Sequence, residues 1–434
     1  MATTGTLNQF NRHGAATMTR SQTRREFLQT TSALMLGAAG MSAAEAQRQL
    51  AAPGQDESYW EMVRAQFSFT EDAVPMNAAN LCPSFRAVAE NVTLLTADID
   101  RDCSFNNRAR FGDLLEETRA RVAAQLNVSA DEVALVRNTS EANNIVNGGL
   151  PLQSGDDVLV WDQNHPTNNV AWEVRAARYG LQVRKVGTPE APQSAQELVD
   201  AFTDEFRDRT AVLAITHVSN VSGIKLPVKE LTRLAHERGI HVHLDGAQTW
   251  GAMAVDLRDL DVDSYSASAH KWYMGPKEVG LLYVRESRIG EIWPSVVAPG
   301  WGNGPETTLT GARKFESLGQ RDDAALAGLG VAAGIHDLIG PRRVEQRIAQ
   351  LAQHLKQGIA DAGFDLLTPM APEFSHGVCI TRLDPEQRGE TVNRLYREHG
   401  IAGAATGGLR LCPTIYNTLE HVDRAAAGVK ALLG

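Results

Sequence analysis

The chain of 434 residues has few cysteines, and no two of them lie at a metal-binding spacing. Cys82, Cys103, Cys379 and Cys412 are far apart and form no C-x-x-C motif, so neither a zinc site nor a dithiol redox motif is predicted. Cys379 in "GVCITRL" and Cys412 in "LRLCP" occur in strand-like apolar runs. All four cysteines are therefore expected to be small buried side chains, while a disulfide in an oxidising compartment stays open.

The sequence also lacks an excess of basic residues. It has 42 lysines and arginines against 52 aspartates and glutamates, which gives a formal net charge of −10. This balance offers no electrostatic reason to expect nucleic acid or an anionic membrane surface as a partner. The apolar fraction of 43% is enough to bury a large core, most simply in two lobes. A small-molecule partner is expected.

An apolar segment near the N-terminus is too short to be a stable membrane span. It runs from about Leu28 to Met41 and is rich in Thr, Ser and Gly, whereas a span needs roughly 20 apolar residues. Arg24-Arg25 precede it, and the small-residue site Ala44-Glu45-Ala46 follows it. This order predicts a twin-arginine export signal over residues 1–46, cleaved after Ala46, and hence a periplasmic protein that uses the twin-arginine translocation machinery. A disordered tail is the alternative.

Strand-like and helical patterns alternate from about residue 131 to residue 285. The apolar runs "VALVRN", "DDVLVWD", "TAVLAITHVS" and "HVHLD" are separated by amphipathic segments, which predicts a mostly parallel sheet covered on both faces. After about residue 320, a long helical pattern is followed by two further strand–helix pairs. The sequence therefore predicts an α/β fold with a smaller α+β C-terminal domain. The expected divisions are a signal peptide over 1–46, an N-terminal segment over 47–95 that packs with the small domain, a large domain over 96–319 and a small domain over 320–434.

Residues with catalytic chemistry occur where the predicted strands end, which is where parallel sheets bind ligands. Lys271 follows the strand in "SASAHKWYMG", and a lysine can form a Schiff base with an aldehyde cofactor, commonly pyridoxal 5′-phosphate (PLP). That cofactor needs a carboxylate at its ring nitrogen, which Asp245 at the end of "HVHLD" can supply. It also needs a phosphate cradle, and Thr139 and Ser140 lie between a strand and a helix, where hydroxyls and backbone N–H groups bind anions.

Six motifs, in this order and spacing, resemble the class V aminotransferase family: "NTSEANN", "NHPTNNVAW", "HVSNVSG", "HLDGAQ", "SASAHK" and "RLCPTIYNT". The resemblance covers nearly all of the chain after residue 46. It implies the fold of type I PLP-dependent transferases and PLP as cofactor. It also implies that Lys271 forms the Schiff base and later carries the substrate proton, and that Asp245 pairs with the ring nitrogen.

The same resemblance implies roles for further residues. His165 would stack on the cofactor ring, Asn220 and Gln248 would contact the ring hydroxyl, and Arg410 would bind a substrate carboxylate. The phosphate would be held by Thr139, Ser140, Ser268 and His270. A homodimer with active sites near the subunit interface is implied, acting on the α-amino group of an amino acid or a derived compound. Transamination and epimerisation through a quinonoid intermediate, and decarboxylation, all stay open as outcomes.

Two departures from the family pattern matter. Cysteine desulfurases of the family carry a nucleophilic cysteine shortly before the carboxylate-binding arginine, and "REHGIAGAATGGLR" contains none, so desulfurase activity is not expected. The family often has Gly-Thr where this chain has Gly319-Gln320, so no contact of Gln320 with a partner subunit's phosphate is carried over. The resemblance is then greatest to the isopenicillin N epimerase-like branch, which includes an exported enzyme that modifies a siderophore side chain. Tailoring of a peptide or siderophore side chain is therefore the alternative function.

Other classes of protein offer rival interpretations. His241, His243 and Asp245 fall on one face of a strand and suggest a metallo-hydrolase site, although Gly246 stands where such sites continue with a histidine. A protein of the same fold that binds without turnover is a second rival. The glycines of "PGWGNGP" follow no strand and open no helix, so they are a weak nucleotide-loop signal.

Each assigned residue also has a structural alternative. Lys271 resembles a surface lysine when taken alone, and His165 before a proline resembles a turn residue. Thr139 and Ser140 are also typical of a helix N-cap, and Arg410 of a structural ion pair.

Overall fold

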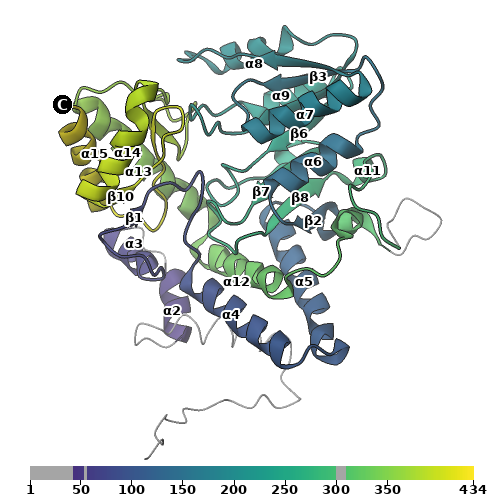
Figure 1. Ribbon diagram of the computed structural model, residues 1–434, viewed down its shortest axis with the longest axis horizontal. Coiled ribbons are helices and arrows are strands. Elements are labelled where there is room, and N and C mark those ends of the chain that lie inside the picture. Colours follow the sequence, from purple (N-terminus) through teal and green to yellow (C-terminus); the bar gives the residue numbers. More distant parts are fainter. Residues whose placement is uncertain (1–42, 53–55, 300–308) are drawn as a thin grey trace, which may run out of the picture.

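The computed structural model describes residues 43–52, 56–299 and 309–434. Figure 1 shows a large lobe built on one twisted sheet and, beside it, a smaller lobe that contains the C-terminus. Most of the expected export signal and most of "PGWGNGP" lie outside the described residues. The expected cleavage site after Ala46 falls within helix α2 (Ala43–Leu50).

The large lobe contains a seven-stranded sheet of order β2-β8-β7-β6-β5-β3-β4. Strand β8 alone runs in the direction opposite to the other six, so the prediction of a mostly parallel sheet is confirmed. The strands are β2 (Val133–Val136), β3 (Asp157–Trp161), β4 (Gln182–Val186), β5 (Thr210–Thr216), β6 (His241–Asp245), β7 (Ser264–Ser268) and β8 (Gly280–Val284).

Both faces of the sheet are buried at β2, β3 and β5, which explains why these strands are apolar runs without strict alternation. In β3, Val158 and Val160 pack with Trp172 of α7 (Pro166–Tyr179) on one face. Leu159 belongs to the core on the other face, together with Phe202 of α8 (Ala195–Thr203). Successive strand side chains point to opposite faces, so each of the two cores receives every second residue.

The segments between the strands form the helices and 3-10 turns that cover the sheet. Helix α7 begins with a proline at its first turn and ends at Gly180 in a left-handed conformation, which is the usual arrangement at helix ends. These elements are α4 (Arg86–Arg101), α5 (Phe105–Gln125), η1 (Ala130–Glu132), α6 (Thr139–Gly149), α7 (Pro166–Tyr179), α8 (Ala195–Thr203), α9 (Val228–His236), α10 (Leu257–Leu260), α11 (Glu286–Ile289), η2 (Gly311–Glu316) and α12 (Asp323–Ile339).

The smaller lobe combines long helices with two short sheets. Strands β9 and β11 pair antiparallel, and β1 from the N-terminal segment pairs parallel with β10. The expected smaller α+β part of the chain is therefore present. Its elements, with those of the N-terminal segment, are α3 (Glu57–Arg64), β1 (Val74–Pro75), α13 (Pro341–Asp361), β9 (Cys379–Thr381), α14 (Pro385–His399), β10 (Ile401–Ala402), β11 (Leu409–Leu411) and α15 (Leu419–Leu433).

The N-terminal segment is attached to the small lobe by side chains as well as by β1. Arg347 of α13, buried beside Trp60, forms an ion pair with Glu57 of α3. The expected boundary at residue 95 falls inside α4, however. Helix α12, expected in the small domain, packs on α4 and α5 (Figure 1).

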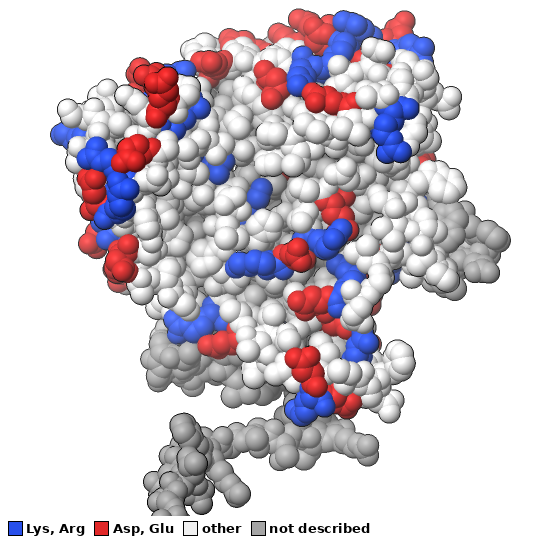
Figure 2. All heavy atoms as spheres, in the orientation of Figure 1, with Lys and Arg blue, Asp and Glu red and all other residues white. Residues whose placement is uncertain are grey.

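The surface charges and the helices of the described residues bear on the partners expected from the sequence. On the face shown in Figure 2, basic and acidic side chains are interspersed, and no extended patch of one sign forms. Within the described ranges, no single helix is both long and apolar enough to cross a membrane. Helices α12 and α13 meet that test only as a pair, by length and composition, with a bend of 79° between them.

Candidate active site

A cavity of about 220 Å³ lies at the carboxyl edge of the parallel strands. It is lined by residues that end or follow β2, β3, β5, β6 and β7, because parallel strands bring their carboxyl ends to one edge of the sheet. All predicted site residues except Arg410 line it: Thr139, Ser140, His165, Asn220, Asp245, Gln248, Ser268, His270 and Lys271.

One end of the cavity is built from hydroxyl groups at the start of α6. The Thr139 N–H donates to Ser268 Oγ at 2.8 Å, and the two side-chain oxygens lie 2.6 Å apart. The N-cap of α6 is Asn138, whose side chain accepts the Glu141 N–H at 3.0 Å. Thr139 and Ser140 are therefore the first helical residues rather than the cap. Hydroxyls and a helix N-terminus suit a phosphate group.

Asp245 ends β6 with its carboxylate at the cavity. The backbone N–H of Ala247 donates to Oδ1 at 3.0 Å, and Asn143 Nδ2 donates to Oδ2 at 2.9 Å. Gly246 is required next to it, because a Cβ there would lie 2.0 Å from the Tyr265 ring. Two donors from the protein therefore fix the position of the carboxylate. Each of its oxygens retains a lone pair that can accept a further hydrogen bond.

Lys271 follows β7 and lines the same cavity as Asp245. Burial lowers the pKa of the Lys271 amine, the Asp245 carboxylate opposes that shift and Arg410 adds to it. A lowered pKa increases the neutral fraction of the amine, which is the nucleophilic form. Because Lys271 lines this cavity together with Asp245, the interpretation as an ordinary surface lysine does not hold.

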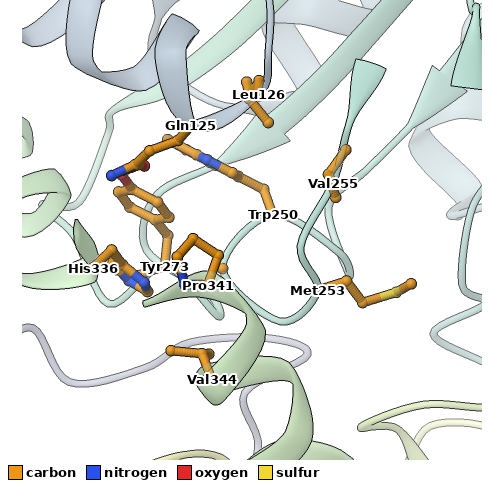
Figure 3. A pocket seen from close by; sticks show the side chains of 10 residues that line it. Gln125, Leu126, Trp250, Met253, Val255, Tyr273, His336, Pro341 and Val344 are labelled. Carbon is orange, nitrogen blue, oxygen red and sulfur yellow. Dashed lines mark hydrogen bonds between the residues drawn. The ribbon is translucent and has the colours of Figure 1, made fainter. Parts of the chain in front are cut away.

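An aromatic stack holds the turn that follows Lys271. Tyr273 lies between Trp250 and His336 of α12, with ring centroids 4.0 Å and 4.2 Å from its own (Figure 3). Its hydroxyl donates to the Gln125 side chain of α5. The cavity beside this stack is only about 20 Å³, enough for about one water molecule. We conclude that this region anchors the lysine turn and leaves no room for a ligand.

The remaining predicted cofactor contacts are held by protein groups around the cavity. Gln248 Nε2 donates to the backbone oxygen of Ala79 at 3.1 Å, and its Oε1 accepts from Trp272 Nε1 at 2.8 Å. His165 caps α7, with its Nδ1 atom 2.7 Å from Thr167 Oγ1, so its turn role and its place in the cavity coexist. Burial lowers the pKa of His165, so its ring is neutral near neutral pH.

Arg410, on β11 of the small lobe, lies beside the cavity lining. Its Nη1 donates to the backbone oxygen of Asn220 at 2.9 Å, and its Nη2 donates to Asn77 Oδ1 at 3.1 Å. Among the described residues it forms no ion pair, and its buried Nε has no hydrogen-bond partner. The structural ion pair considered for Arg410 is absent from the described part of the chain, and the guanidinium is held next to Asn220, which lines the cavity.

The metal-site alternative is not supported by the geometry. In the described part of the chain, no group of three or more His, Cys, Asp and Glu side chains is arranged to hold a metal ion. His241 and His243 are buried, and burial lowers the pKa of His241 to about 4 and that of His243 to about 3. Both rings contact Ser264 Oγ. These histidines are occupied by hydrogen bonds within the protein.

Two parts of the site were not predicted. Asn143 lies one helical turn after Thr139 and reaches Asp245, and this i, i+4 spacing is a signal that could have found it. The segment from Asn77 to Asn80 contributes Asn80 to the lining and contacts Arg410 and Gln248. Nothing in its local sequence indicates this placement.

The cysteines are free thiols and do not line the cavity. Cys82, Cys379 and Cys412 are buried, and burial raises the pKa of Cys82 and of Cys379 to about 12. Such thiols are poor nucleophiles at neutral pH. The expectation that all four cysteines are buried is wrong for Cys103, which is exposed, with its Sγ 3.2 Å from the backbone oxygen of Ile99.

The site residues fit PLP. Its aldehyde would meet the Lys271 amine, its ring nitrogen Asp245, and its phosphate the hydroxyls at the start of α6. The mostly parallel sheet, the smaller α+β lobe and this lysine–aspartate cavity define a fold-type-I PLP-dependent enzyme.

The chain belongs to the class V aminotransferase family, because the family model "Aminotransferase class-V" matches residues 86–424. It is 30% identical over 392 residues to the isopenicillin N epimerase of Streptomyces clavuligerus, covering 86% of this chain and 98% of that protein. It is also 30% identical over 356 residues to a cysteine desulfurase of Escherichia coli, covering 75% of this chain and 84% of that protein. The cofactor of this protein is PLP.

Solved structures show the same fold. A C-DES mutant with glycine covalently linked to its PLP cofactor matches with a TM-score of 0.77 at 23% identity, covering 85% of this chain and 98% of that chain. The cysteine desulfurase CsdA of Escherichia coli matches with a TM-score of 0.75 at 23% identity, covering 86% and 98%.

Proposed function

We propose that this protein transaminates or epimerises an amino acid, or a compound derived from one, at the carbon that bears its α-amino group. The observation that carries this proposal is the shared cavity of Lys271 and Asp245, with the Arg410 guanidinium beside it. The similarity to isopenicillin N epimerases over 86% of the chain supports the same class of reaction. A peptide or siderophore side chain with a free amino group is the alternative substrate.

In this proposal, Lys271, Asp245 and Arg410 have separate roles. Bound PLP supplies an electron sink for the bond that breaks at Cα. The Lys271 Nζ atom, neutral in part because its pKa is lowered, removes the Cα proton and returns it. Asp245 holds the ring nitrogen of the cofactor, while Arg410 orients the substrate through its carboxylate.

Cysteine desulfurase activity is the competing function, since desulfurases are among the relatives. It requires a reactive thiol at the substrate, and no cysteine lines the described cavity. The buried cysteines have raised pKa values because burial disfavours their thiolates. The site therefore favours transamination or epimerisation over desulfuration.

The test is to incubate the holoenzyme with a panel of amino acids in D₂O and to follow Cα deuteration by mass spectrometry and chirality by chromatography. With L-cysteine, a thiol reductant is added, and alanine and sulfide are measured. We expect deuterium at Cα of the accepted substrates, with either a keto acid or the inverted amino acid as product. Alanine formation from L-cysteine that exceeds Cα exchange on the other amino acids, with sulfide released in step by the thiol reductant, would contradict the proposal and favour the desulfurase.

Arg410→Lys is expected to lower kcat/KM by about 10- to 100-fold, because lysine keeps the charge but loses the planar fork that grips a carboxylate with two hydrogen bonds. PLP content should not change, since Arg410 does not line the cofactor cavity. Steady-state kinetics on the best substrate measure the effect.

Arg382→Lys provides the matched control, because Arg382 follows the neighbouring strand β9 and forms an exposed ion pair with Glu190. A silent Arg410→Lys would mean either that the substrate offers no carboxylate there or that the guanidinium is structural. A decarboxylated analogue separates the two, since in the first case it should react as well as the parent compound.

We also propose that the protein is exported folded, with PLP already bound, through the twin-arginine route. The support is the order of Arg24-Arg25, the apolar segment and Ala44-Glu45-Ala46. Replacing both arginines by lysine keeps the charge, so PLP-bound protein should accumulate in the cytoplasm at the expense of the periplasm. Fractionation with N-terminal sequencing measures this, with Gln47 as the expected first residue. Normal export of the double variant would show that the segment is no such signal.

A homodimer is the assembly we propose. Gln320, at the position where the family often has a threonine, contacts its own chain: its Oε1 accepts from Arg108 Nη2 at 2.7 Å. No role at the partner's phosphate is assigned to it. Light scattering of the holoenzyme would measure the oligomeric state.

A further inference from the structure

A row of buried polar side chains leads from the back of Asp245 into the sheet. Asn143 Nδ2 lies 2.9 Å from Asp245 Oδ2, and Asn143 Oδ1 lies 2.9 Å from His243 Nε2. His243 Nδ1 lies 2.8 Å from Ser264 Oγ, which lies 3.2 Å from His241 Nε2. All five side chains are at least nine-tenths buried. None of the last three lines the cavity.

The orientation of each bond follows from the carboxylate at the end of the row. An ionised carboxylate only accepts hydrogen bonds, so Asn143 must turn its Nδ2 to Asp245 and its Oδ1 to His243. The amide oxygen accepts from His243 Nε2–H and also from the Ser266 hydroxyl. The opposite amide orientation would place two acceptors against each other.

The tautomers of the histidines follow in turn. Burial keeps both rings neutral by lowering the pKa values of His241 and His243. A neutral His243 that donates from Nε2 must accept at Nδ1, and the donor there is the Ser264 hydroxyl. Ser264 Oγ can then accept from His241 Nε2–H. Every donor in the row therefore points toward Asp245.

We propose that Asn143, His243 and Ser264 are positioning residues for Asp245. They orient its carboxylate and polarise the hydrogen bond that it accepts from Asn143, so that the carboxylate binds the ring nitrogen of PLP. Hydrogen bonds in a row strengthen one another when their donors point the same way, and a buried site favours this effect. The inference rests on the cofactor role of Asp245 in the proposed function. It gives a role to the two histidines on the strand that carries Asp245.

The experiment uses PLP as the probe and titrates it into apoprotein while the visible absorbance of the bound cofactor is followed. Asn143→Leu removes the donor to Asp245 and should raise the Kd for PLP by about 10-fold or more, with a shifted absorption band. His243 does not line the cavity, and its hydrogen bonds go to Asn143 and Ser264 and not to Asp245. His243→Leu should nevertheless raise the Kd by about 3- to 10-fold. His243→Gln carries an N–H at the place of Nε2–H and should recover most of that loss.

Thr232→Val is the matched control, because Thr232 is a fully buried threonine on α9 outside the row. Thermal unfolding of the apoproteins checks that each variant is folded. If a His243 variant does not fold, Ser264→Ala replaces it with an expected 2- to 5-fold rise in Kd, on the same reasoning.

Two results would overturn the inference. One is an Asn143→Leu protein that binds PLP with wild-type affinity and an unchanged spectrum. The other is equal behaviour of His243→Leu and His243→Gln, which would show that ring volume matters and the hydrogen bond does not. Failure of the wild-type protein to bind PLP would instead overturn the cofactor role itself, so the two failures are distinguishable.

Discussion

Lys271→Ala is expected to lower kcat by about 10³-fold or more, because the variant loses both the covalent attachment point of the cofactor and the base that moves the Cα proton. Weak PLP binding should persist through the groups at the start of α6 and through Asp245. Measuring kcat on the best substrate and PLP content in parallel separates a loss of catalysis from a loss of bound cofactor.

Borohydride reduction supplies an independent readout of the same residue. In the wild type it should fix the cofactor covalently on the peptide that contains Lys271, with loss of the yellow colour. Lys277→Ala is the matched control: Lys277 lies six residues further on, contacts Cys82 O and Ser84 Oγ, and does not line the cavity. Before reduction, the Lys277→Ala protein should have the colour and the activity of the wild type. A label on any peptide other than that of Lys271 would refute the assignment.

Asp245→Asn should lower kcat by about 10²- to 10³-fold or more, although the two side chains have the same shape. The carboxylate accepts from Ala247 N–H and Asn143 Nδ2–H, and it has lone pairs left for the ring nitrogen. An amide has only one acceptor atom. Its NH₂ group must therefore face either one of these two donors or the ring nitrogen, and one hydrogen bond is lost. Loss of one partner from a buried charged pair costs about 3–5 kcal/mol, which corresponds to this loss in rate.

The measurement is the single-turnover rate of the PLP-saturated variant, which removes any effect of weaker cofactor binding. Asp162→Asn serves as the control, because Asp162 follows β3 at the same edge of the sheet, is exposed and does not line the cavity. An Asp245→Asn enzyme with a rate within a few-fold of wild type would show that the ring nitrogen has no need of a charged partner.

The sequence by itself determined the architecture of the large lobe and the position of the site. Two-sided apolar runs such as that of β3 predict buried parallel strands, and the polar residues that follow the strands predict a cavity at their carboxyl edge. Lys271 and Asp245 were predicted in this way, and the motifs around them predicted the family. The edge strand β4 was missed, because Arg184 and Lys185 interrupt its apolar pattern.

The tertiary structure alone decided how the predicted groups are oriented and which unpredicted groups support them. Asn143 and Asp245 are 102 positions apart, and Asn77 and Arg410 are 333 positions apart. It also placed α12 on α4 and α5, gave the N-cap of α6 to Asn138 and gave His241 and His243 hydrogen-bond partners within the protein. The physical reason is that hydrophobic periodicity records which face of an element is buried. The partner of a buried polar atom depends instead on how distant elements pack, and no local pattern carries that information.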